Sequence, residues 1–522
     1  MQAARKKRIL WVDDEVDLLK AHVIFLQEKG FVVSTTTNGE DALILLREQP
    51  IDLVLLDEQM PGKRGIAVLK DIKFEFPHLP VIMVTKSEGE EVMDQAIGRK
   101  VDDYIIKPFS PPQLLSACKR FLEGERISRE RLVQDFVTSF RELEDLIRSD
   151  LAWEDWARLY LRIVRWEMNL MDMEEKGLLN SISDLKKEFR SMFSRYVAES
   201  YRDWMVSETD RPVFSSDLVK KYLYPVFAKH GRVIFIVIDC LRLDQWESLL
   251  PEITPFFDVR TELYYSILPS ATPYSRNAIF SGLMPLDIHR NFPEYWDLKA
   301  DDELSLNRFE KELFIAHLEK LGFKDTKQVR FERILTKSDG HALTKKLSGL
   351  LQNKLVAVVY NFVDNLTHGR SESEILLEMV PDEEAMRSMT RTWLLHSSIY
   401  DLLKSAASEQ IPVVITSDHG SVHCFHPLVV YAKKDASTNL RYKFGENLRA
   451  EGKEAYSEKE PETIGLKTRG INTNFLFAMD DRYFVYPTKL REYQNRYYGS
   501  FLHGGISPEE LILPISLLTP RT

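Results

Sequence analysis

The sequence predicts a multidomain α/β protein in which a helical segment joins two α/β units. With 522 residues, the chain is longer than one hydrophobic core usually organises, so we expect two or three domains. Short β-branched runs alternate with amphipathic stretches at the start of the chain and again in its second half, which is typical of parallel sheets covered by helices. The stretch between them is charged, rich in Leu and Trp and poor in Gly and Pro, as helices are. We place the domains at residues 1–122, 123–210 and 211–522.

The charge, the cysteine count and the apolar runs of the chain argue against several classes of protein. The net charge of -10 argues against a protein that grips duplex DNA through a basic face. Cys118, Cys240 and Cys424 form an odd count at unpatterned spacing, which indicates reduced thiols rather than a disulfide framework. The basic N-terminus lacks the apolar stretch and cleavage site of a signal peptide, and no run approaches the ~20 apolar residues that span a bilayer. We therefore expect a cytoplasmic protein without membrane insertion.

Five apolar runs define the first domain, and several of them end in polar residues. The runs are RILWV, FVVSTTT, DLVLL, VIMVT and DYIIK. The polar residues at their ends are Asp13, Asp14, Asp57, Thr85 and Lys107. In a parallel sheet such ends gather at one edge, where ligands bind. We therefore expect these side chains to form one site.

Three carboxylates in one site need a cation between them. Asp13, Asp14 and Asp57 would repel one another unless a hard divalent ion neutralised them, and Mg²⁺ suits such an oxygen-only set. With Mg²⁺ present, Asp57 could attack an activated phosphoryl group. The Thr85 hydroxyl and the Lys107 ammonium would then bind the oxygens of the acyl phosphate.

The constellation DD, D-x-x-MPG, T and KP resembles the response-regulator receiver, and the resemblance covers the whole first domain. It implies a flavodoxin-like (βα)5 fold. It also implies the phosphorylation site Asp57, the Mg²⁺ ligands Asp13, Asp14 and Asp57, and the switch residues Thr85, Tyr104 and Lys107. Glu58 departs from the pattern, because an apolar residue is more usual after the acceptor. The other interpretation is that the acids merely end the strands of a domain that does not switch.

The middle segment predicts a helical bundle that joins the first domain to the last. Its apolar positions recur near helical spacing, as in LVQDFVTSFRELEDLI and LYLRIVRWEMNLM. Trp153, Trp156, Trp166 and Trp204 lie among Leu and Ile at this spacing, so we expect them in the bundle core rather than at a ligand platform. The segment contains no helix-turn-helix pattern with a basic reading face, so a DNA-binding output lacks support.

Three further apolar runs predict parallel strands that deliver metal ligands to one edge of a second sheet. RVIFIVIDC leads to Asp239, LVAVVYNFVDN to Asp364, and IPVVITSDHG to Asp418 and His419. In DNLTH, a helical turn would put Asp364 and His368 on the same face. Oxygen and imidazole ligands without thiolate suit Zn²⁺ or Mn²⁺ better than Ca²⁺.

This set resembles the alkaline phosphatase superfamily, in particular its PglZ branch, over the last domain. The resemblance implies an alkaline-phosphatase-like α/β fold with two Zn²⁺ ions. It assigns Asp364, His368 and His503 to one ion, Asp239, Asp418 and His419 to the other, and Thr272 to both as the bridging nucleophile. The segment TPYSRNAIFSGLMP after Ala271 also resembles the nucleophile segment of nucleotide phosphodiesterases. Two metal ions can ionise a hydroxyl nucleophile and stabilise both in-line oxygens of a phosphorus centre.

Other residues are weaker candidates. Arg276 and Asn277 follow Thr272 closely enough to contact phosphate oxygens, although they could equally be exposed helix residues. Residues 287–340 and 435–465 interrupt the alternation of strands and helices, and they predict lids or catalytically silent loops.

The whole chain resembles the PorX-type response regulators associated with type IX protein secretion. This resemblance implies a sensor histidine kinase as phosphoryl donor and an effector that cleaves nucleotide or oligonucleotide phosphodiesters. We also expect phosphorylation to favour a homodimer. Two alternatives stay open. The same site could act as a phosphomonoesterase, sulfatase or mutase. The domain could instead be a non-catalytic zinc-binding adaptor that contacts a sigma factor or a secretion component.

Overall fold

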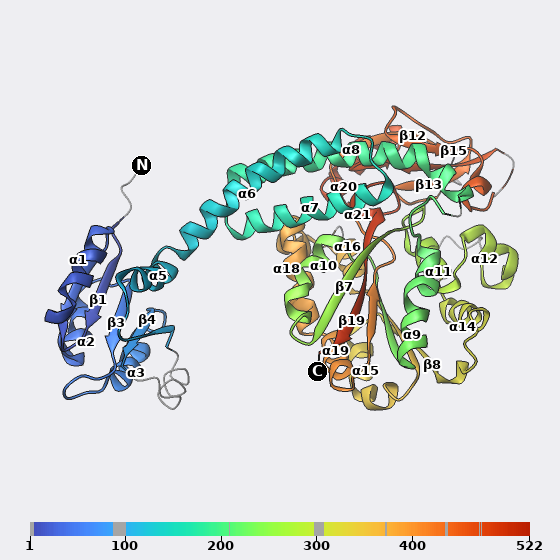
Figure 1. Ribbon diagram of the computed structural model, residues 1–522. Helices are drawn as coiled ribbons and strands as arrows, with labels where there is room; N and C mark the ends of the chain where they lie inside the picture. The colour runs from blue at the N-terminus through green and yellow to red at the C-terminus, as the bar shows by residue number, and fades with distance from the viewer. Residues whose placement is uncertain are drawn as a thin grey trace. The chain divides into compact units, whose positions relative to one another are not determined.

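The chain forms two compact units, Met1–Ser139 and Phe140–Thr522. The computed structural model in Figure 1 describes residues 5–86, 101–207, 209–296, 307–370, 373–433, 437–468, 470 and 472–521.

The first unit contains a five-stranded parallel sheet in the order β2-β1-β3-β4-β5. Its strands are β1 (Arg8–Val12), β2 (Val32–Thr36), β3 (Leu53–Asp57), β4 (Val81–Thr85) and β5 (Asp103–Ile106). The helices are η1 (Val16–Leu19), α1 (Lys20–Glu28), α2 (Gly39–Glu48), α3 (Gly65–Glu75) and α5 (Pro111–Leu122). This strand order is that of flavodoxin-like folds, so the predicted fold class of the first domain is confirmed.

The inner strands β1, β3 and β4 are buried on both faces of this sheet because they are apolar at successive positions. Ile9 and Trp11 of β1 pack in one core with residues of α1 and α5. Leu10 and Val12 point to the opposite face and pack with residues of α2 and α3. This arrangement explains why RILWV reads as a continuous apolar run instead of alternating with polar residues.

Three long helices follow, as the helical spacing predicts. They are α6 (Gly124–Ile147), which crosses the boundary between the units, α7 (Trp153–Asp172) and α8 (Lys176–Val206). Of the four tryptophans expected in the core, Trp156 and Trp204 are 4% and 5% exposed, in agreement with that role, whereas Trp153 and Trp166 are only half-buried. The ring of Trp156 lies 5.2 Å from that of Phe189, and Trp204 lies 5.9 Å from Tyr265, so α8 packs against the following domain.

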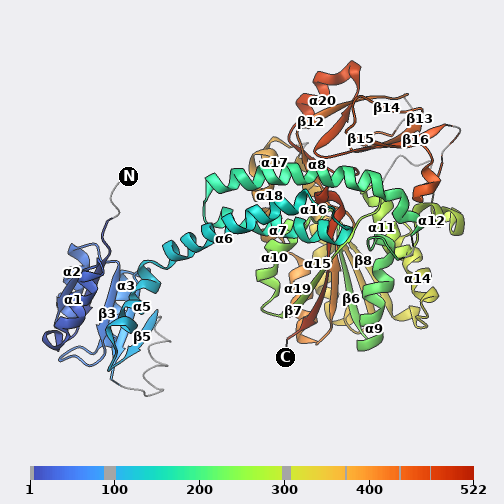
Figure 2. The ribbon, with the colours of Figure 1, turned by 45° about the horizontal axis from the view of Figure 1, so that its top comes forward.

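The second unit is built on a six-stranded mixed sheet in the order β7-β19-β10-β6-β9-β8. Its strands are β6 (Val233–Ile238), β7 (Phe257–Tyr265), β8 (Val329–Ile334), β9 (Leu355–Tyr360), β10 (Val413–Thr416) and β19 (Ile512–Pro520). β10, β6, β9 and β8 run parallel, whereas β19 and β7 pair antiparallel at one edge. Helices lie on both faces of this sheet, which gives the predicted α/β layers (Figure 2).

The helices of this unit form two groups by the core in which they take part. The core on one face includes residues of α10 (Leu243–Ile253), α15 (Lys337–Leu350), α18 (Glu383–Leu395) and α19 (Ser398–Ser408). The core on the other face includes residues of η3 (Val219–Leu223), α11 (Thr272–Ser281) and α14 (Glu310–Lys320), with α9 (Tyr224–His230) packed against it. Further short helices are η2 (Ser215–Asp217), α12 (Pro285–Asn291), η4 (Pro293–Tyr295), η5 (Thr326–Gln328), α16 (Phe362–Arg370), α17 (Glu374–Met379) and α21 (Pro508–Leu511).

The strand predictions for the last domain are confirmed. β6 lies between β10 and β9, and all of its residues are buried. Ile234 and Ile236 belong to one core and Phe235 and Val237 to the other, as expected of a central strand. Because β6, β9 and β10 run parallel, the residues that follow them meet at one edge of the sheet.

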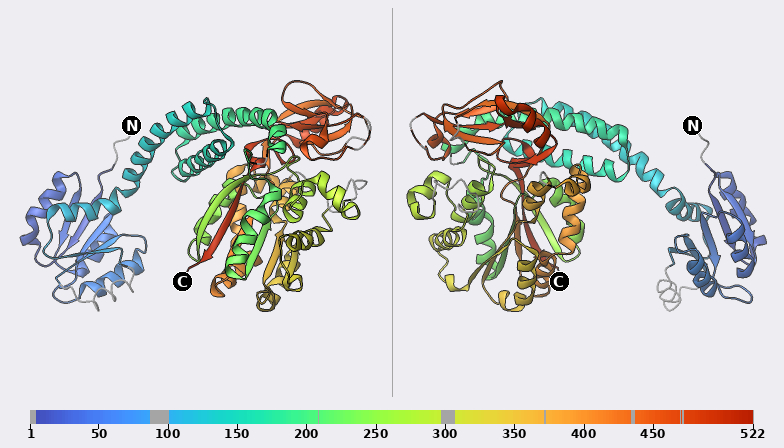
Figure 3. Two further views of the ribbon diagram at one scale, coloured as in Figure 1. Left: turned by 45° about the vertical axis from the view of Figure 1, so that its right-hand side comes forward. Right: turned by 180° about the vertical axis from the view of Figure 1, so that it is seen from behind.

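Three small sheets lie beside that edge, and we call their described residues between 422 and 502 the cap (Figure 3). Its strands are β11 (Val422–Cys424), β12 (His426–Tyr431), β13 (Tyr442–Glu446), β14 (Arg449–Ala450), β15 (Ala455–Glu458), β16 (Thr473–Ala478), β17 (Arg482–Val485) and β18 (Ser500–Leu502). They pair as β11-β18, β14-β12-β17 and β13-β16-β15. Its helices are η6 (Pro461–Ile464), η7 (Pro487–Lys489) and α20 (Leu490–Tyr497).

The predicted lids fall partly within these elements. The stretch 287–340 includes most of α12, η4, α14, η5 and β8, and its residues 297–306 lie outside the described residues. The stretch 435–465 includes β13, β14 and β15, and residues 435 and 436 lie outside the described residues. Whether either stretch moves as a lid stays a prediction.

The three cysteines are buried free thiols, as predicted from their number and spacing. Within the described ranges, no helix is both long enough and apolar enough to cross a membrane.

Candidate active site

Thr272 lies at the start of α11, at the carboxyl edge of the six-stranded sheet. Its side chain is buried, and its Oγ1 atom lies 2.9 Å from Nε2 of His419 and 3.4 Å from Oδ1 of Asp239. Asp239 directly follows β6, and His419 follows β10 by three residues. The hydroxyl therefore faces two of the residues that the sequence predicts as metal ligands.

The predicted ligands gather on either side of Thr272 in two groups. Asp239, Asp418 and His419 form one group, and Asp364, His419 and His503 form the other. In each group the candidate ligand atoms lie within 4.8 Å of one another, as required for a shared ion. His419 takes part in both groups, and its ring stacks on that of His503 with centroids 4.2 Å apart.

His368 lies beside the second group. Its Nε2 atom is 3.0 Å from Nε2 of His503 and 3.4 Å from Oδ1 of Asp364, although its side chain is 52% exposed. Asp364 and His368 lie one turn apart on α16, as predicted from their spacing of four. The structure thus brings all seven predicted residues of the centre together, with His419 more central than the predicted division assigns it.

Two buried carboxylate oxygens point to a cation. Oδ1 of Asp364 and Oδ2 of Asp418 are inaccessible to solvent and accept no hydrogen bond in the part of the chain that the structure describes. A buried carboxylate oxygen without a donor is costly, because it has lost its water without replacement. A divalent cation would satisfy both atoms, and the mixture of carboxylate and imidazole suits Zn²⁺.

The ionisation equilibria reflect this crowding of charges. Burial and the neighbouring Asp418 raise the pKa of Asp239 well above its usual range. Burial also disfavours the charged form of Asp364, yet the neighbouring His368, with His503 and His419, lowers its pKa. Burial lowers the pKa of His503 well below the usual value, and His419 adds to this effect. In this site, the charge of each carboxylate and imidazole therefore depends on its burial and on the charges of its neighbours.

Contacts with backbone groups orient the side chains of His419 and Asp418. Nδ1 of His419 lies 3.1 Å from the carbonyl oxygen of Gly420, which leaves Nε2 directed at Thr272. Oδ1 of Asp418 accepts from the backbone N–H groups of Cys240 at 3.2 Å and His419 at 3.0 Å. Cys240 adopts a left-handed backbone with φ of 64°, which is uncommon outside glycine and occurs often at functional sites.

Sequence reasoning missed Asn361, whose side chain donates from Nδ2 to Oδ2 of Asp239 at 2.7 Å. It follows the last residue of β9 and is buried. The donated hydrogen bond leaves Oδ1 of Asp239 as the oxygen that faces Thr272. The signal available in the sequence is a polar residue at the end of an apolar strand, three positions before Asp364.

Arg276 and Asn277 are both buried. Arg276 pairs with Oδ2 of Asp239 and donates from Nε to Glu310 at 2.5 Å, and its Nη1 lies 3.8 Å from Asp418. Asn277 donates to the carbonyl oxygen of Pro273 at 2.8 Å. Arg276 thus holds a carboxylate of the centre in place, and substrate contact by either residue stays a prediction.

The first unit gathers its own site at the carboxyl edge of its sheet. Asp13, Asp14 and Asp57 present oxygens within 4.8 Å of one another. Nζ of Lys107 lies 2.7 Å from Asp13 and 2.9 Å from Asp57. Burial raises the pKa of Asp57, against the opposing effect of Lys107. This is the geometry expected of a Mg²⁺ site with an adjacent phosphoryl acceptor.

Glu58 contacts a predicted switch residue. The hydroxyl of Thr85 donates to Oε2 of Glu58 at 2.7 Å, and both residues are buried. The carboxylate that departs from the receiver pattern is therefore bound to the hydroxyl expected to bind phosphate. Tyr104 is half-buried on β5 and packs against the core that contains Val12.

Comparison with protein families identifies the large domain. The model of the BREX system PglZ alkaline phosphatase-like domain matches residues 218–517, which is more than half of the chain. The chain belongs to the PglZ alkaline phosphatase-like family. The PglZ domain is preceded by a response regulator receiver domain at 9–119 and a PorX response regulator linker domain at 126–205. This is the domain combination of a PorX-type response regulator, and its receiver implies a cognate sensor histidine kinase.

Three similar proteins each match about a quarter of the chain. A probable transcriptional regulator ycf27 of Cyanidium caldarium is 41% identical over 123 residues, which are 23% of this chain and 48% of that protein. The transcriptional regulatory protein ResD of Bacillus subtilis is 34% identical over 122 residues, 23% of this chain and 50% of that protein. The chain therefore spans about half the length of these curated relatives. The receiver domain of NtrX from Brucella abortus is 35% identical and covers 22% of this chain and 98% of that one, with a TM-score of 0.21.

Proposed function

We propose that this PglZ protein is a signal-controlled, zinc-dependent phosphodiesterase with Thr272 as its nucleophile. The observation that carries the proposal is the position of the Thr272 hydroxyl, 2.9 Å from His419 and 3.4 Å from Asp239, between two groups of candidate metal ligands. Its control would come from phosphorylation of Asp57 by a sensor histidine kinase. The match to the PorX linker domain supports a role in type IX protein secretion.

Two Zn²⁺ ions fit the donor set. Asp239, Asp418 and His419 would hold one ion, and Asp364, His503 and His368 the other, with His419 close to both. When bound, such ions lower the pKa of a coordinated hydroxyl and stabilise developing charge on phosphoryl oxygens.

The chain itself positions the nucleophile and its substrate. His419 and Asp239 fix the Thr272 hydroxyl from two directions, so that little rotational freedom is lost during reaction. Thr272 opens the ten-residue helix α11, whose N-terminal end carries partial positive charge. A phosphate group in front of Thr272 would meet that end, where anions are favoured.

The environment of Arg276 favours a diester over a monoester. A phosphodiester carries one negative charge, whereas a monoester dianion calls for additional cationic partners. Arg276, four residues after Thr272, pairs with Asp239 and Glu310. Because its charge is already balanced by protein carboxylates, we favour nucleotide or oligonucleotide diesters as substrates.

Matched aryl substrates test the reaction class. Zinc-reconstituted protein should hydrolyse an aryl phosphodiester with a higher kcat/KM than the corresponding aryl phosphomonoester or aryl sulfate. A preference for the monoester or the sulfate would reassign the same site to the other chemistry. Absence of turnover on all three, with zinc bound, would favour the adaptor that contacts a sigma factor or a secretion component.

Intact-mass measurement tests the control by phosphorylation. Incubation with acetyl phosphate and Mg²⁺ should add one phosphoryl group to the wild type and none to Asp57→Asn. Equal labelling of both proteins would place the acceptor elsewhere.

A further inference from the structure

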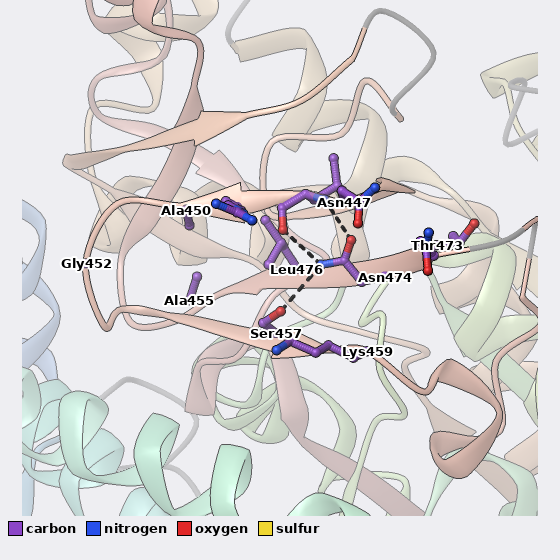
Figure 4. Close-up of a pocket in the computed structure, with 12 residues that line it drawn as sticks. Asn447, Ala450, Gly452, Ala455, Ser457, Lys459, Thr473, Asn474 and Leu476 are labelled. Atoms are coloured by element: carbon purple, nitrogen blue, oxygen red, sulfur yellow. Dashed lines mark hydrogen bonds between the residues drawn. The ribbon is translucent and has the colours of Figure 1, made fainter.

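The cap contains a cavity that is distinct from the candidate active site. Its volume is about 630 Å³, enough for a drug-sized ligand. It lies where the chain passes from β14 in one small sheet to β15 in another, and residues of β16 also line it (Figure 4). Its lining residues are Asn447, Leu448, Arg449, Ala450, Gly452, Ala455, Ser457, Lys459, Asn472, Thr473, Asn474 and Leu476.

The side chains around this cap cavity attract anions. Arg449 and Lys459 line it, and the described lining residues include no carboxylate. Neither Arg449 nor Lys459 forms an ion pair with another residue in the described ranges, although the chain carries a net charge of -10. Both side chains belong to exposed residues. Two cations at one cavity that form no ion pair within the described part of the chain favour a phosphate-bearing ligand.

The walls of the cap cavity are fixed by one buried amide. The side chain of Asn474 accepts from the backbone N–H of Leu448 at 2.8 Å and donates to its carbonyl oxygen at 3.0 Å. It also lies 3.4 Å from the hydroxyl of Ser457 (Figure 4). Leu448 and Leu476 also line the cavity, and both belong to the buried core of the cap. A preformed cavity binds with little ordering cost.

The side-chain amides of two further residues, Asn447 and Asn472, also line the cap cavity. Asn447 and Asn472 are exposed and adopt left-handed backbones with φ of 51° and 59°, and both lie just beyond the same end of the β13-β16 pairing, next to the pair Glu446 and Thr473. The N–H of Asn447 donates to the carbonyl oxygen of Asn472 at 3.1 Å, so the two residues are held together. Carboxamides pair with the edges of nucleobases through adjacent donor and acceptor atoms.

We propose that the cap cavity binds a nucleotide. Arg449 and Lys459 bind its phosphate, and the amide of Asn447 or Asn472 binds the edge of its base. This site lies beyond the proposed hydrolysis, because it uses none of the candidate metal ligands. The ligand is either a free nucleotide or the far end of an oligonucleotide substrate, which present the same chemistry.

Calorimetric titration of the full-length protein with adenosine 5′-monophosphate tests the site. Arg449→Ala/Lys459→Ala should weaken binding about tenfold or more, because hydrogen bonds to charged groups are lost. Lys489→Ala/Arg491→Ala removes the same charge from exposed cap residues outside the cavity and should leave the affinity unchanged. Asn447→Gly and Asn472→Gly keep the left-handed backbone, which glycine adopts readily, and test the amides alone.

Three outcomes would overturn the proposal. The first is equal affinity in the wild type and in Arg449→Ala/Lys459→Ala. The second is an equal loss of affinity in Lys489→Ala/Arg491→Ala. The third is inorganic phosphate binding as tightly as the nucleotide, which would remove the base from the recognition.

Hydrolysis assays of the same variants separate the two sources of the ligand. If the cavity holds the far end of the substrate, Arg449→Ala/Lys459→Ala should raise KM for an oligonucleotide and leave kcat/KM for an aryl phosphodiester unchanged. If it holds a free nucleotide, KM for both substrates should stay unchanged while nucleotide binding is weakened. Protein without any phosphodiesterase activity would contradict the proposed function, but binding to the cap cavity would remain measurable.

Discussion

At the residue scale, we expect the contact between Glu58 and Thr85 to oppose the proposed receiver switch. The Thr85 hydroxyl donates to the buried Glu58 carboxylate at 2.7 Å, so binding of a phosphoryl group by Thr85 requires that this bond break. A net hydrogen bond contributes about 0.5–1.5 kcal/mol, which corresponds to an effect of roughly 2- to 10-fold.

We therefore expect Glu58→Leu to increase the steady-state phosphorylation of Asp57 by roughly 2- to 10-fold at limiting acetyl phosphate. Intact-mass measurement at fixed times gives the extent. Glu58→Gln keeps an acceptor for Thr85 and removes the charge, so it separates the hydrogen bond from electrostatic repulsion. A lower extent of phosphorylation in Glu58→Leu would show that Glu58 assists the switch instead.

Asn361 is the second residue with a testable role, because its amide holds Asp239 through a 2.7 Å hydrogen bond. Loss of a group that orients a metal ligand typically weakens metal binding by about 10- to 100-fold. Asn361→Ala should therefore lose zinc to a competing chelator at a correspondingly lower chelator concentration. Asn365→Ala, one turn further along α16 and exposed, serves as the matched control. Equal zinc retention in the wild type and in Asn361→Ala would contradict the assigned role.

At the element scale, α8 contacts the segment that follows His503. Oε1 of Glu509 accepts from Nε and Nη2 of Arg190 at 3.0 and 2.6 Å, and both residues are buried. A Cβ on Gly420 would lie 2.0 Å from the carbonyl oxygen of Glu509, so the backbone next to His419 packs directly on Glu509. The linker helix thereby supports the residue that faces Thr272.

Removal of one partner of the Arg190–Glu509 ion pair should destabilise the second unit. Arg190→Met leaves a buried carboxylate without its partner, which costs about 3–5 kcal/mol. Calorimetry should show a lower Tm for the transition of this unit. Arg190→Met/Glu509→Leu removes both charges and should recover much of the loss. An unchanged Tm in the single variant would mean that the pair contributes little to stability.

Some elements of the fold could be predicted from the sequence and others could not. β6, β9 and β10 were predictable because each is an apolar run with an Asp or Asn one or two residues after it, and the parallel sheet then brings their ends together. The cap was not predictable, because the pairing of its strands in three small sheets depends on tertiary packing and leaves no local pattern. The fold class was therefore accessible, whereas the cap cavity required the structure.

The contacts that hold the residues of the candidate active site in place could not be predicted from the sequence either. Asn361 lies 122 positions from Asp239, and Glu310 lies 34 positions from Arg276. Such contacts follow from tertiary packing and leave no local pattern. The shared position of His419 between the two ligand groups likewise depends on the three-dimensional arrangement.

At the scale of the whole molecule, the proposed control requires that phosphorylation of the receiver be transmitted to the PglZ domain. Receivers commonly change their association when an anionic phosphoryl group rearranges a surface. We expect phosphorylated protein to sediment as a dimer at micromolar concentration. Asp57→Asn treated identically should keep the sedimentation coefficient of the unphosphorylated protein. Identical sedimentation of phosphorylated and unphosphorylated wild type would rule out control through dimerisation.

The central claim is that the Thr272 hydroxyl is the nucleophile. The most direct measurement compares hydrolysis of an aryl phosphodiester by the wild type, Thr272→Ser and Thr272→Ala, with zinc content determined in each preparation. Thr272→Ser keeps the hydroxyl and should retain measurable turnover, whereas Thr272→Ala should lose activity by roughly 10³-fold or more. Turnover by zinc-loaded Thr272→Ala at the wild-type rate would contradict the account.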